Sequence, residues 1–392
     1  MGWNKVAIVG VGMTKFGELY EKSHEILIQE AFLEAVAGVD KGIDPKEIQA
    51  AWFGACRSDL AGSINVGGST LTGSIGLKGI HAMRVDSGGA TGGDTFRNAC
   101  IAVGSGVFDV ALALGAEKMR DVPSTTVLSM HTEGNPLLER GMAETSIFAA
   151  LGARHMYEFG TTKEQMASVT VKNRKNGVLD PYCQFQSEIT IEDVLNSPIV
   201  CQPFNLLDCC AQSDGAAAAI VCRADLAEKY TDKPVYVAGM GMGTDHPFMM
   251  DKDNFIQVDA TIRAAKEAFR LAGGIGPKDI DVAEIHDSFS ITELISYEDL
   301  GFCEKGEGGK FIESGATEIG GRIPVNPSGG ILSRGYPISA SGLAQIAELF
   351  WQFREEVPAR RQVKINNGYA LQHDMGGKGY ANAVVNILTN RL

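Results

Sequence analysis

Three short motifs occur twice in this chain, in the same order, and this duplication limits the folds that the chain can adopt. The motifs are an apolar segment that carries Gly-x-Gly-Met, a Glu-Ala-Phe triplet and an Ile-x-Pro-Lys-acid-Ile segment. They lie at 6–17 and 235–247, at 30–32 and 267–269, and at 43–48 and 275–280. A shared order is improbable for chance matches, so the sequence predicts two related halves.

A fourth repeat marks a helix in each half. Ala90-Thr91-Gly92 and Ala340-Ser341-Gly342 each precede a stretch of small residues, and we expect helices over 93–104 and 343–353. Strand-like segments therefore alternate with helix-like segments in both halves. This alternation predicts an α/β fold with mostly parallel sheets covered by helices.

The duplication also predicts the domain organisation. We expect an N-terminal half formed by residues 1–120 and 201–233, with a cap inserted at 121–200. Residues 234–392 are expected to form the C-terminal half. The cap is rich in Met, Thr, Glu and Asn and carries helix-like stretches at 142–159 and 163–176. The small apolar residues at 213–222 predict a strand that returns to the first sheet.

The paired Gly-x-Gly motifs do not have the spacing of a dinucleotide site. Gly10-Val-Gly12 and Gly239-Met-Gly241 lack the third glycine, and no helix is expected to begin directly after Gly12. We interpret both motifs as structural turns that follow short strands.

Composition excludes several classes of protein. The chain has 35 Lys and Arg against 48 Asp and Glu, a net charge of −13, which argues against the basic face of a nucleic-acid-binding protein. No apolar run reaches the roughly 18–20 residues of a membrane span, and the first residues lack the pattern of a signal peptide. The expected location is the cytoplasm, with eight reduced cysteines. No metal site is expected, because no cysteines have Cys-x₂-Cys spacing.

Four segments at the expected ends of strands could build a ligand site. Three are rich in glycine and the fourth carries His286, and they lie at 85–93, 326–337, 371–379 and 284–290. In open α/β sheets, ligands bind beyond the carboxyl ends of strands, often at helix N-termini. We therefore place the candidate site at these segments.

These segments, together with Leu-Leu-Asp-Cys-Cys at 206–210 and Arg-His-Met at 154–156, resemble the thiolase superfamily, in particular its sterol-carrier-protein and archaeal branch. The resemblance runs nearly end to end. It implies a thiolase-like five-layer α/β sandwich of two duplicated βαβαβαββ halves with an inserted loop domain, in agreement with the repeats. It also implies a coenzyme A (CoA) thioester as substrate, no tightly bound cofactor and a homodimer of this chain.

Three reactive positions of the family pattern carry other residues here. Aligned on Ala90-Thr91-Gly92, the family's nucleophilic cysteine falls on Gly89. The cysteine of its His-Asp-Cys-Phe segment falls on Ser288, and the histidine of its Gly-His-Pro segment falls on Tyr336. Glycine cannot form an acyl-enzyme, so covalent thiolysis through this position is excluded. The small Gly89 also predicts room for a bulky β-substituent of the substrate.

The groups that remain suit noncovalent chemistry on a thioester. The N–H groups of Gly89 and of the Gly376–Gly377 turn can form an oxyanion hole. His286 can polarise a carbonyl group, and Tyr336 can donate or accept a proton. The resemblance implies further residues that bind the substrate, and others that support the site from behind. The binding residues are Ser288, His155, Met156, Gly376 and Ser339, and the supporting residues are Asp287, His373 and Asn326.

Other cysteines are weaker candidates for a nucleophile. Cys56 ends an apolar segment and could approach the site. Cys100 lies about three helical turns past Gly89 and is expected to face elsewhere. Cys209 and Cys210 are expected to be buried.

Three functions are consistent with these residues. The first is retro-aldol cleavage of a bulky β-hydroxyacyl-CoA to a ketone or aldehyde and an acyl-CoA, with Tyr336 taking the hydroxyl proton. The second is thiolysis of a bulky β-oxoacyl-CoA by free CoA without a covalent intermediate. The third is a noncatalytic subunit that binds CoA thioesters. The chain resembles thiolase-like steroid side-chain aldolases, which lack the nucleophile and use tyrosines. That resemblance favours the first function and implies a small zinc-ribbon/OB-fold partner protein.

Overall fold

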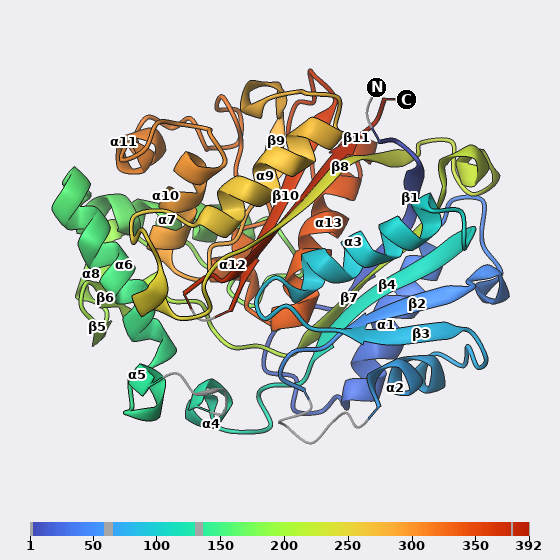
Figure 1. The fold of residues 1–392 in the computed structure, drawn as a ribbon, viewed down its shortest axis with the longest axis horizontal. Coiled ribbons are helices and arrows are strands. Elements are labelled where there is room, and N and C mark those ends of the chain that lie inside the picture. Colours follow the sequence, from blue (N-terminus) through green and yellow to red (C-terminus); the bar gives the residue numbers. More distant parts are fainter. Residues whose placement is uncertain (1–2, 59–65, 130–135, 378, 392) are drawn as a thin grey trace.

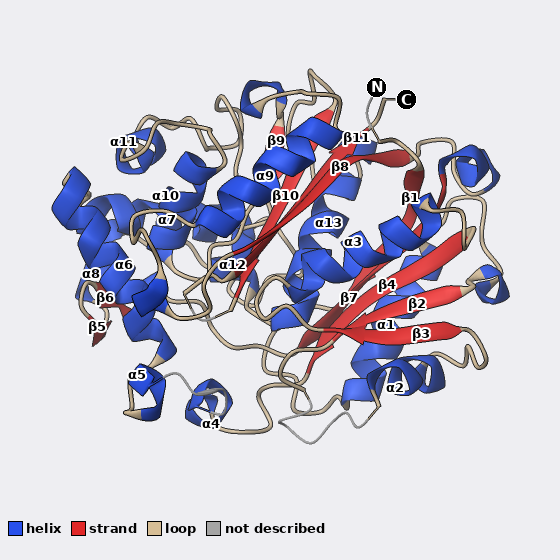
Figure 2. Cartoon of the chain, viewed as in Figure 1, coloured by secondary structure: helices blue, strands red, loops and turns tan. Residues whose placement is uncertain are grey.

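One mixed sheet contains strands from both halves of the chain (Figure 1, Figure 2). The computed structural model describes residues 3–58, 66–129, 136–377 and 379–391. Within these residues the sheet has nine strands in the order β3-β2-β4-β7-β1-β8-β11-β10-β9. Their bounds are Val6–Met13 for β1, Ala50–Gly54 for β2, His81–Val85 for β3, Val110–Glu117 for β4, Gly215–Arg223 for β7, Val235–Thr244 for β8, Val282–Glu284 for β9, Tyr369–Gly376 for β10 and Asn382–Thr389 for β11.

Each half of the sheet has the same topology, which confirms the duplication. Among the described residues, three strand pairs of this sheet are parallel and five are antiparallel, so the expectation of mostly parallel sheets is wrong. β2 is parallel to β4, β4 is antiparallel to β7, and β7 is antiparallel to β1. In the second half, β9, β10, β11 and β8 have the same order and directions. The predicted strand over 213–222 is confirmed as β7, between β4 and β1. The halves join where β1 runs antiparallel to β8, with Ala7 opposite Tyr236 and Ile8 opposite Val235.

The two Gly-x-Gly motifs lie inside strands, so the expectation of turns there is wrong. β1 and β8 continue through the glycines. A β carbon on Gly12 would lie 2.3 Å from the backbone nitrogen of Ala35, and one on Gly241 would lie 1.9 Å from the carbonyl oxygen of Ala264. The glycines therefore let helices α1 (His24–Ala37) and α9 (Asp259–Leu271) pack directly on the strands.

Helices α3 (Thr91–Gly104) and α13 (Ile338–Arg354) form a central layer between the two halves of the sheet. α13 packs on β1, β4 and β7 of the first half and on β9 and β10 of the second half. α1 and α9 cover the outer faces, which completes five layers. The central helices meet at their first turns, where a β carbon on Gly92 would lie 2.7 Å from the backbone nitrogen of Gly342. The predicted helices over 93–104 and 343–353 are confirmed, with slightly earlier starts.

The helices expected over 142–159 and 163–176 are confirmed as α6 (Glu144–Phe159) and α7 (Lys163–Gly177). Thr162 caps α7 by accepting a hydrogen bond from the backbone of Gln165, and Gly160 ends α6 in the left-handed region at φ 74°. α7 packs against three helices of the second half. The remaining elements are α2 (Gly67–Ser74), α4 (Ser124–Ser129), α5 (Pro136–Glu139), α8 (Ile191–Asn196), β5 (Ile199–Cys201), β6 (Phe204–Asn205), α10 (Ser290–Asp299), α11 (Gly308–Glu313) and α12 (Gly330–Arg334).

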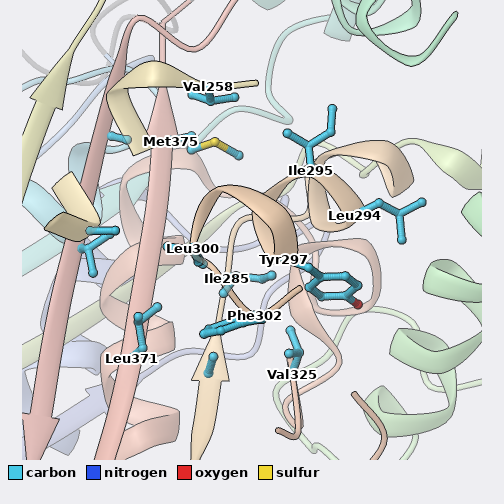
Figure 3. Close-up of a cluster of buried hydrophobic side chains, with 14 of the residues drawn as sticks. Val258, Ile285, Leu294, Ile295, Tyr297, Leu300, Phe302, Val325, Leu371 and Met375 are labelled. Atoms are coloured by element: carbon cyan, nitrogen blue, oxygen red, sulfur yellow. The ribbon is translucent and has the colours of Figure 1, made fainter. Parts of the chain in front are cut away.

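A buried apolar cluster supports the second half of the sheet (Figure 3). It includes Ile285 after β9, Leu294 on α10, and Leu371 and Met375 on β10, all at most 1% exposed. Ile285 directly precedes His286, and Met375 directly precedes Gly376. Close packing of these apolar neighbours therefore fixes the backbone from which two of the candidate site segments project.

Candidate active site

A cavity of about 630 Å³ opens where the predicted segments converge. Loops that follow β3, β9 and β10 line it, together with the segment that enters α13. Helix α6 supplies a further wall through Glu144 and Phe148. The predicted site residues that the structure brings together here are Gly89, His286, Ser288, Tyr336, Gly376 and Gly377.

The Tyr336 hydroxyl lies where a side chain at position 89 would project. A β carbon placed on Gly89 would lie 2.6 Å from the Tyr336 hydroxyl oxygen and 3.3 Å from Cε1 of His286. The rings of His286 and Tyr336 meet edge to face with centroids 5.6 Å apart. The space expected beside Gly89 for a bulky substituent is therefore occupied by the phenol. Burial raises the pKa of Tyr336 well above its usual value, and the nearby charge of Asp374 adds to this shift.

Two glycine loops meet here by backbone contact. The β carbon that Gly89 lacks would lie 2.3 Å from the carbonyl oxygen of Met375, and one on Gly376 would lie 2.6 Å from the Gly89 nitrogen. Only residues without side chains permit this approach. The N–H groups of Gly89 and Gly377 have no acceptor among the hydrogen bonds of the described residues. Both residues line the cavity, as an oxyanion hole requires.

His286 is held by a carboxylate on the neighbouring strand. Its Nδ1 lies 2.8 Å from Oδ1 of Asp374 on β10, and both residues are at most 1% exposed. Burial raises the pKa of Asp374, although the bond to His286 opposes the shift. With Nδ1 engaged, Nε2 is the ring nitrogen available to a ligand.

Sequence reasoning missed Tyr380, which directly follows the glycine segment at 371–379. Its hydroxyl lies 3.1 Å from Oγ of Ser288, and both side chains line the cavity. The Tyr380 ring packs on Phe148 of α6, with centroids 4.3 Å apart, and on His286, at 5.9 Å. Burial raises the pKa of Tyr380, so its hydroxyl keeps its proton. In the sequence, the signal that could have pointed to Tyr380 is that it is a second tyrosine beside segments whose family-typical reactive side chains are replaced.

We expect the Ser288–Tyr380 hydrogen bond to contribute about 0.5–1.5 kcal/mol to the free energy of unfolding. Ser288→Ala and Tyr380→Phe each remove one partner of this hydrogen bond. The double variant should therefore lose less stability than the sum of the two single variants. Denaturant unfolding of the four proteins measures this coupling, and strict additivity would remove the bond from the native state in solution.

Asp287 and Asn326 lie behind the cavity and hold the His286 segment. The carboxylate of Asp287 accepts hydrogen bonds from the backbone of Ile331 at 2.7 Å and from Nδ2 of Asn173 at 2.7 Å. Asn326 Oδ1 accepts from the backbone of Ile285 at 2.8 Å. These bonds run between segments that are distant in sequence, and they fix the loop that presents His286.

Three residues that were expected to bind the substrate lie away from the cavity, and so does His373, which was expected only to support the site from behind. His155 is buried, with its Nδ1 2.8 Å from Oγ1 of Thr161 and its Nε2 3.2 Å from Oε1 of Glu298. Met156 packs on the apolar cluster of the second half. Ser339 is buried and donates to Glu117 at 2.6 Å. His373 points to the opposite face of β10 from Asp374, where its Nε2 lies 2.9 Å from Thr261 Oγ1. In this structure all four serve packing or hydrogen bonding rather than the cavity wall.

Three thiols line the cavity, and this corrects one expectation. Cys209 and Cys210 are partly exposed there rather than buried, because their backbone runs beside Ser288 and Phe289. Cys56 also lines the cavity, whereas Cys100 lies on α3 and is buried away from the cavity, as expected. The surrounding protein limits the access of water to these thiols, which raises the pKa of Cys56 and Cys210 well above the usual value and that of Cys209 to about 12. A protonated thiol is a poor nucleophile, so the raised pKa values argue against these residues as substitutes for the cysteine missing at Gly89.

Among the described residues, no three His, Cys, Asp or Glu side chains are grouped closely enough to hold a metal ion. In the same part of the chain, no helix has both the length and the apolar character needed to cross a bilayer. The groups that this chain brings to the cavity include backbone N–H groups, one histidine and two tyrosines, together with the three thiols and several charged side chains.

The amino-acid sequence matches two domain families along most of its length. The family described as "Thiolase, N-terminal domain" matches residues 6–225, and "Thiolase C-terminal domain-like" matches residues 241–390. The interval between the two matches contains the start of β8, the first strand of the second half.

Similar proteins include enzymes with three different names. The chain is 42% identical over 380 residues to "Acetyl-CoA acetyltransferase" of Methanothermobacter thermautotrophicus, covering 97% of this chain and 98% of that one. It is 36% identical over 379 residues to "Benzoylsuccinyl-CoA thiolase subunit BbsB" of Thauera aromatica, covering 95% of each. Among solved structures it superposes on "Ltp2-ChsH2(DUF35) aldolase" with a TM-score of 0.85 and 26% identity, covering 99% of this chain and 98% of that one.

Proposed function

The chain belongs to the thiolase superfamily, and from that premise we propose that it breaks or forms the Cα–Cβ bond of a CoA thioester without a cysteine-bound acyl intermediate. It is an acyl-CoA acyltransferase or lyase. The observation that carries the proposal is the Tyr336 hydroxyl, 2.6 Å from where a β carbon of residue 89 would stand. A proton-transfer group occupies the place from which the family's nucleophile acts.

Retro-aldol cleavage of a β-hydroxyacyl-CoA suits this arrangement best. The ionised Tyr336 oxygen takes the proton of the β-hydroxyl group, and the electrons of that O–H bond form the carbonyl of a ketone or aldehyde. The Cα–Cβ bond breaks, and its electron pair passes to the thioester as an enolate. Protonation at Cα then gives the shorter acyl-CoA. In the condensation direction the same phenol donates its proton to the new alkoxide.

The enolate oxygen needs donors that are fixed in advance. Nε2 of His286 and the N–H groups of Gly89 and Gly377 surround the cavity and have no acceptor among the described residues. Removing one such donor typically costs about 10²–10³ in rate. The bond between His286 and Asp374 orients the ring for this role.

A second candidate is thiolysis of a bulky β-oxoacyl-CoA by free CoA. The names of the two curated relatives, an acetyl-CoA acetyltransferase and a subunit of a thiolase, favour this reaction. Without a cysteine at position 89, the CoA thiolate would attack the β-carbonyl directly. Tyr336 would then donate to that carbonyl, and His286 would stabilise the enolate that leaves.

The names of similar proteins also support a complex. One relative is named as a subunit, and the name of the superposed aldolase joins Ltp2 to ChsH2(DUF35). We therefore propose a homodimer of this chain that works with a small zinc-ribbon/OB-fold partner. In this proposal CoA enters as part of the substrate, and no other cofactor is required.

A direct assay separates these functions. We would incubate the chain, alone and with any co-purifying protein, with 3-hydroxy-3-phenylpropionyl-CoA, and separately with 3-oxo-3-phenylpropionyl-CoA plus CoA. Release of benzaldehyde without free CoA supports the aldolase. Benzoyl-CoA that forms only when CoA is added supports the noncovalent thiolase. If neither product forms while CoA still binds, the result favours the binding subunit. An acyl adduct that survives denaturation would contradict the noncovalent route.

A further inference from the structure

Arg57 is a buried cation on the cavity wall without a described counter-charge. It directly follows Cys56 at the end of β2, lines the cavity and is 9% exposed. Its backbone N–H donates to the buried Glu117 at 3.1 Å, which fixes the start of the side chain. No hydrogen bond or ion pair of its guanidinium group appears among the described residues.

Among the described residues, no acidic side chain forms an ion pair with the Arg57 guanidinium group, and the carboxylate of Glu117 accepts hydrogen bonds from backbone N–H and hydroxyl groups instead. Asp86 lies 3.7 Å from Arg84, and Asp245 forms an ion pair with Lys252 at 2.5 Å. Glu144 also lines the cavity, but no ion pair joins it to Arg57 among the described residues. A guanidinium group stays protonated in proteins, so a buried arginine cannot shed its charge when it lacks a partner. A ligand anion would supply the missing partner.

The place of Arg57 on the cavity wall determines which part of a bound CoA thioester it can contact. Cys56 belongs to a small apolar cluster with Met119, Val127 and Ile338, against which Tyr336 packs. Consecutive Cα atoms are about 3.8 Å apart, so Arg57 begins one residue from the wall that holds the reacting tyrosine. If the thioester group reacts beside Tyr336, the phosphates of its CoA are separated from that point by the whole pantetheine arm. The acyl part of the substrate is therefore the nearer source of an anion.

We propose that Arg57 binds a second carboxylate, carried on the acyl part of the thioester, so that the substrate class is a carboxylated acyl-CoA. This inference rests on the proposed function, since it assumes that a CoA thioester occupies the cavity. The planar guanidinium group can hold a carboxylate by two parallel N–H···O bonds. Such a pair would hold the acyl part of the substrate at a second point, in addition to its thioester group. An uncharged acyl part would leave Arg57 unpaired.

Thioether analogues of CoA test this binding without turnover. The full-length protein, with its partner if one co-purifies, would be titrated calorimetrically with S-(ω-carboxyalkyl)-CoA ligands of two to four methylenes. Each is compared with the carbamoyl ligand of the same length, which is nearly isosteric but neutral. We expect at least one carboxylate to bind the wild-type protein at least tenfold more tightly than its amide. Equal affinity for every pair would overturn the inference.

Substitutions at Arg57 assign the preference. Arg57→Gln should bring the affinities of that carboxylate and its amide within about twofold of each other, and Arg57→Lys should restore part of the difference. Affinity for CoA itself should stay unchanged, which also shows that the variants fold. If Arg57→Gln weakens both ligands equally, Arg57 contacts the CoA moiety and the inference fails. Since none of these ligands reacts, the outcome is independent of whether the chain catalyses the proposed cleavage.

Discussion

Replacing Tyr336 by phenylalanine is expected to lower kcat for cleavage of a β-hydroxyacyl-CoA by about 10²–10⁴-fold, the usual contribution of a positioned general acid or base. The variant keeps the ring that packs beside His286 and removes only the hydroxyl group next to Gly89. Affinity for CoA should therefore change little. Steady-state kinetics with the phenyl-substituted β-hydroxyacyl-CoA measures the loss, and wild-type turnover would remove Tyr336 from the mechanism.

The pH profile gives a second readout of the same group. Burial raises the pKa of Tyr336 well above its usual value near 10. Cleavage needs the ionised phenol, whose small fraction grows as pH rises toward that pKa. The wild-type rate should therefore increase with pH through about pH 9, and Tyr336→Phe should lose this increase. Tyr157→Phe is the matched control, because Tyr157 is 81% exposed on α6 and should behave as wild type.

Restoring the family's cysteine by Gly89→Cys should damage the protein rather than recover a thiolase. Its β carbon would lie 2.3 Å from the carbonyl oxygen of Met375 and 2.6 Å from the Tyr336 hydroxyl. One of these contacts is backbone, so the loop or the end of β10 must move. Overpacking of this kind typically costs about 1–3 kcal/mol. Cleavage activity should also fall sharply, because the shift displaces the tyrosine and the N–H group of residue 89.

Denaturant unfolding and the cleavage assay together test this expectation. Gly73→Cys is the control, since Gly73 on α2 has open space at its β position and should tolerate the same change. In the Gly89→Cys background, Tyr336→Phe should recover part of the lost stability by removing one of the two contacts. Full stability and activity for Gly89→Cys alone would show that Tyr336 does not occupy this space in solution.

Local patterns in the sequence predict most of the fold but not the contacts at its centre. The repeated motifs predict the duplicated topology because the same strand and helix order recurs in both halves. The glycines of β1 and β8 mislead, since close packing of a helix and a turn both select glycine. Only the three-dimensional structure distinguishes the two, through the distances from Gly12 to Ala35 and from Gly241 to Ala264.

At the candidate site, too, the sequence predicts the residues but not the contacts between them. Alignment to the family pattern finds Gly89, His286 and Tyr336, because these replace known reactive positions. It does not reveal that Gly89 and Tyr336 compensate one another, since 247 residues separate them and their distance depends on tertiary packing. Arg57 and Glu144 were missed for the same reason. Each is an ordinary charged residue in the sequence and gains its meaning only from the cavity that it lines.

The contact between the two halves has the form of an isologous dimer interface. In a two-fold symmetric dimer, the elements that lie on the symmetry axis meet their own counterparts. Here β1 pairs with β8, and Gly92 on α3 meets Gly342 on α13. The single chain thus contains a pseudo-symmetric contact of the kind that two subunits form, but the equivalence ends at the cavity. The first half contributes the bare backbone of Gly89 and the second half contributes His286 and Tyr336, so both halves are needed to complete the one candidate site.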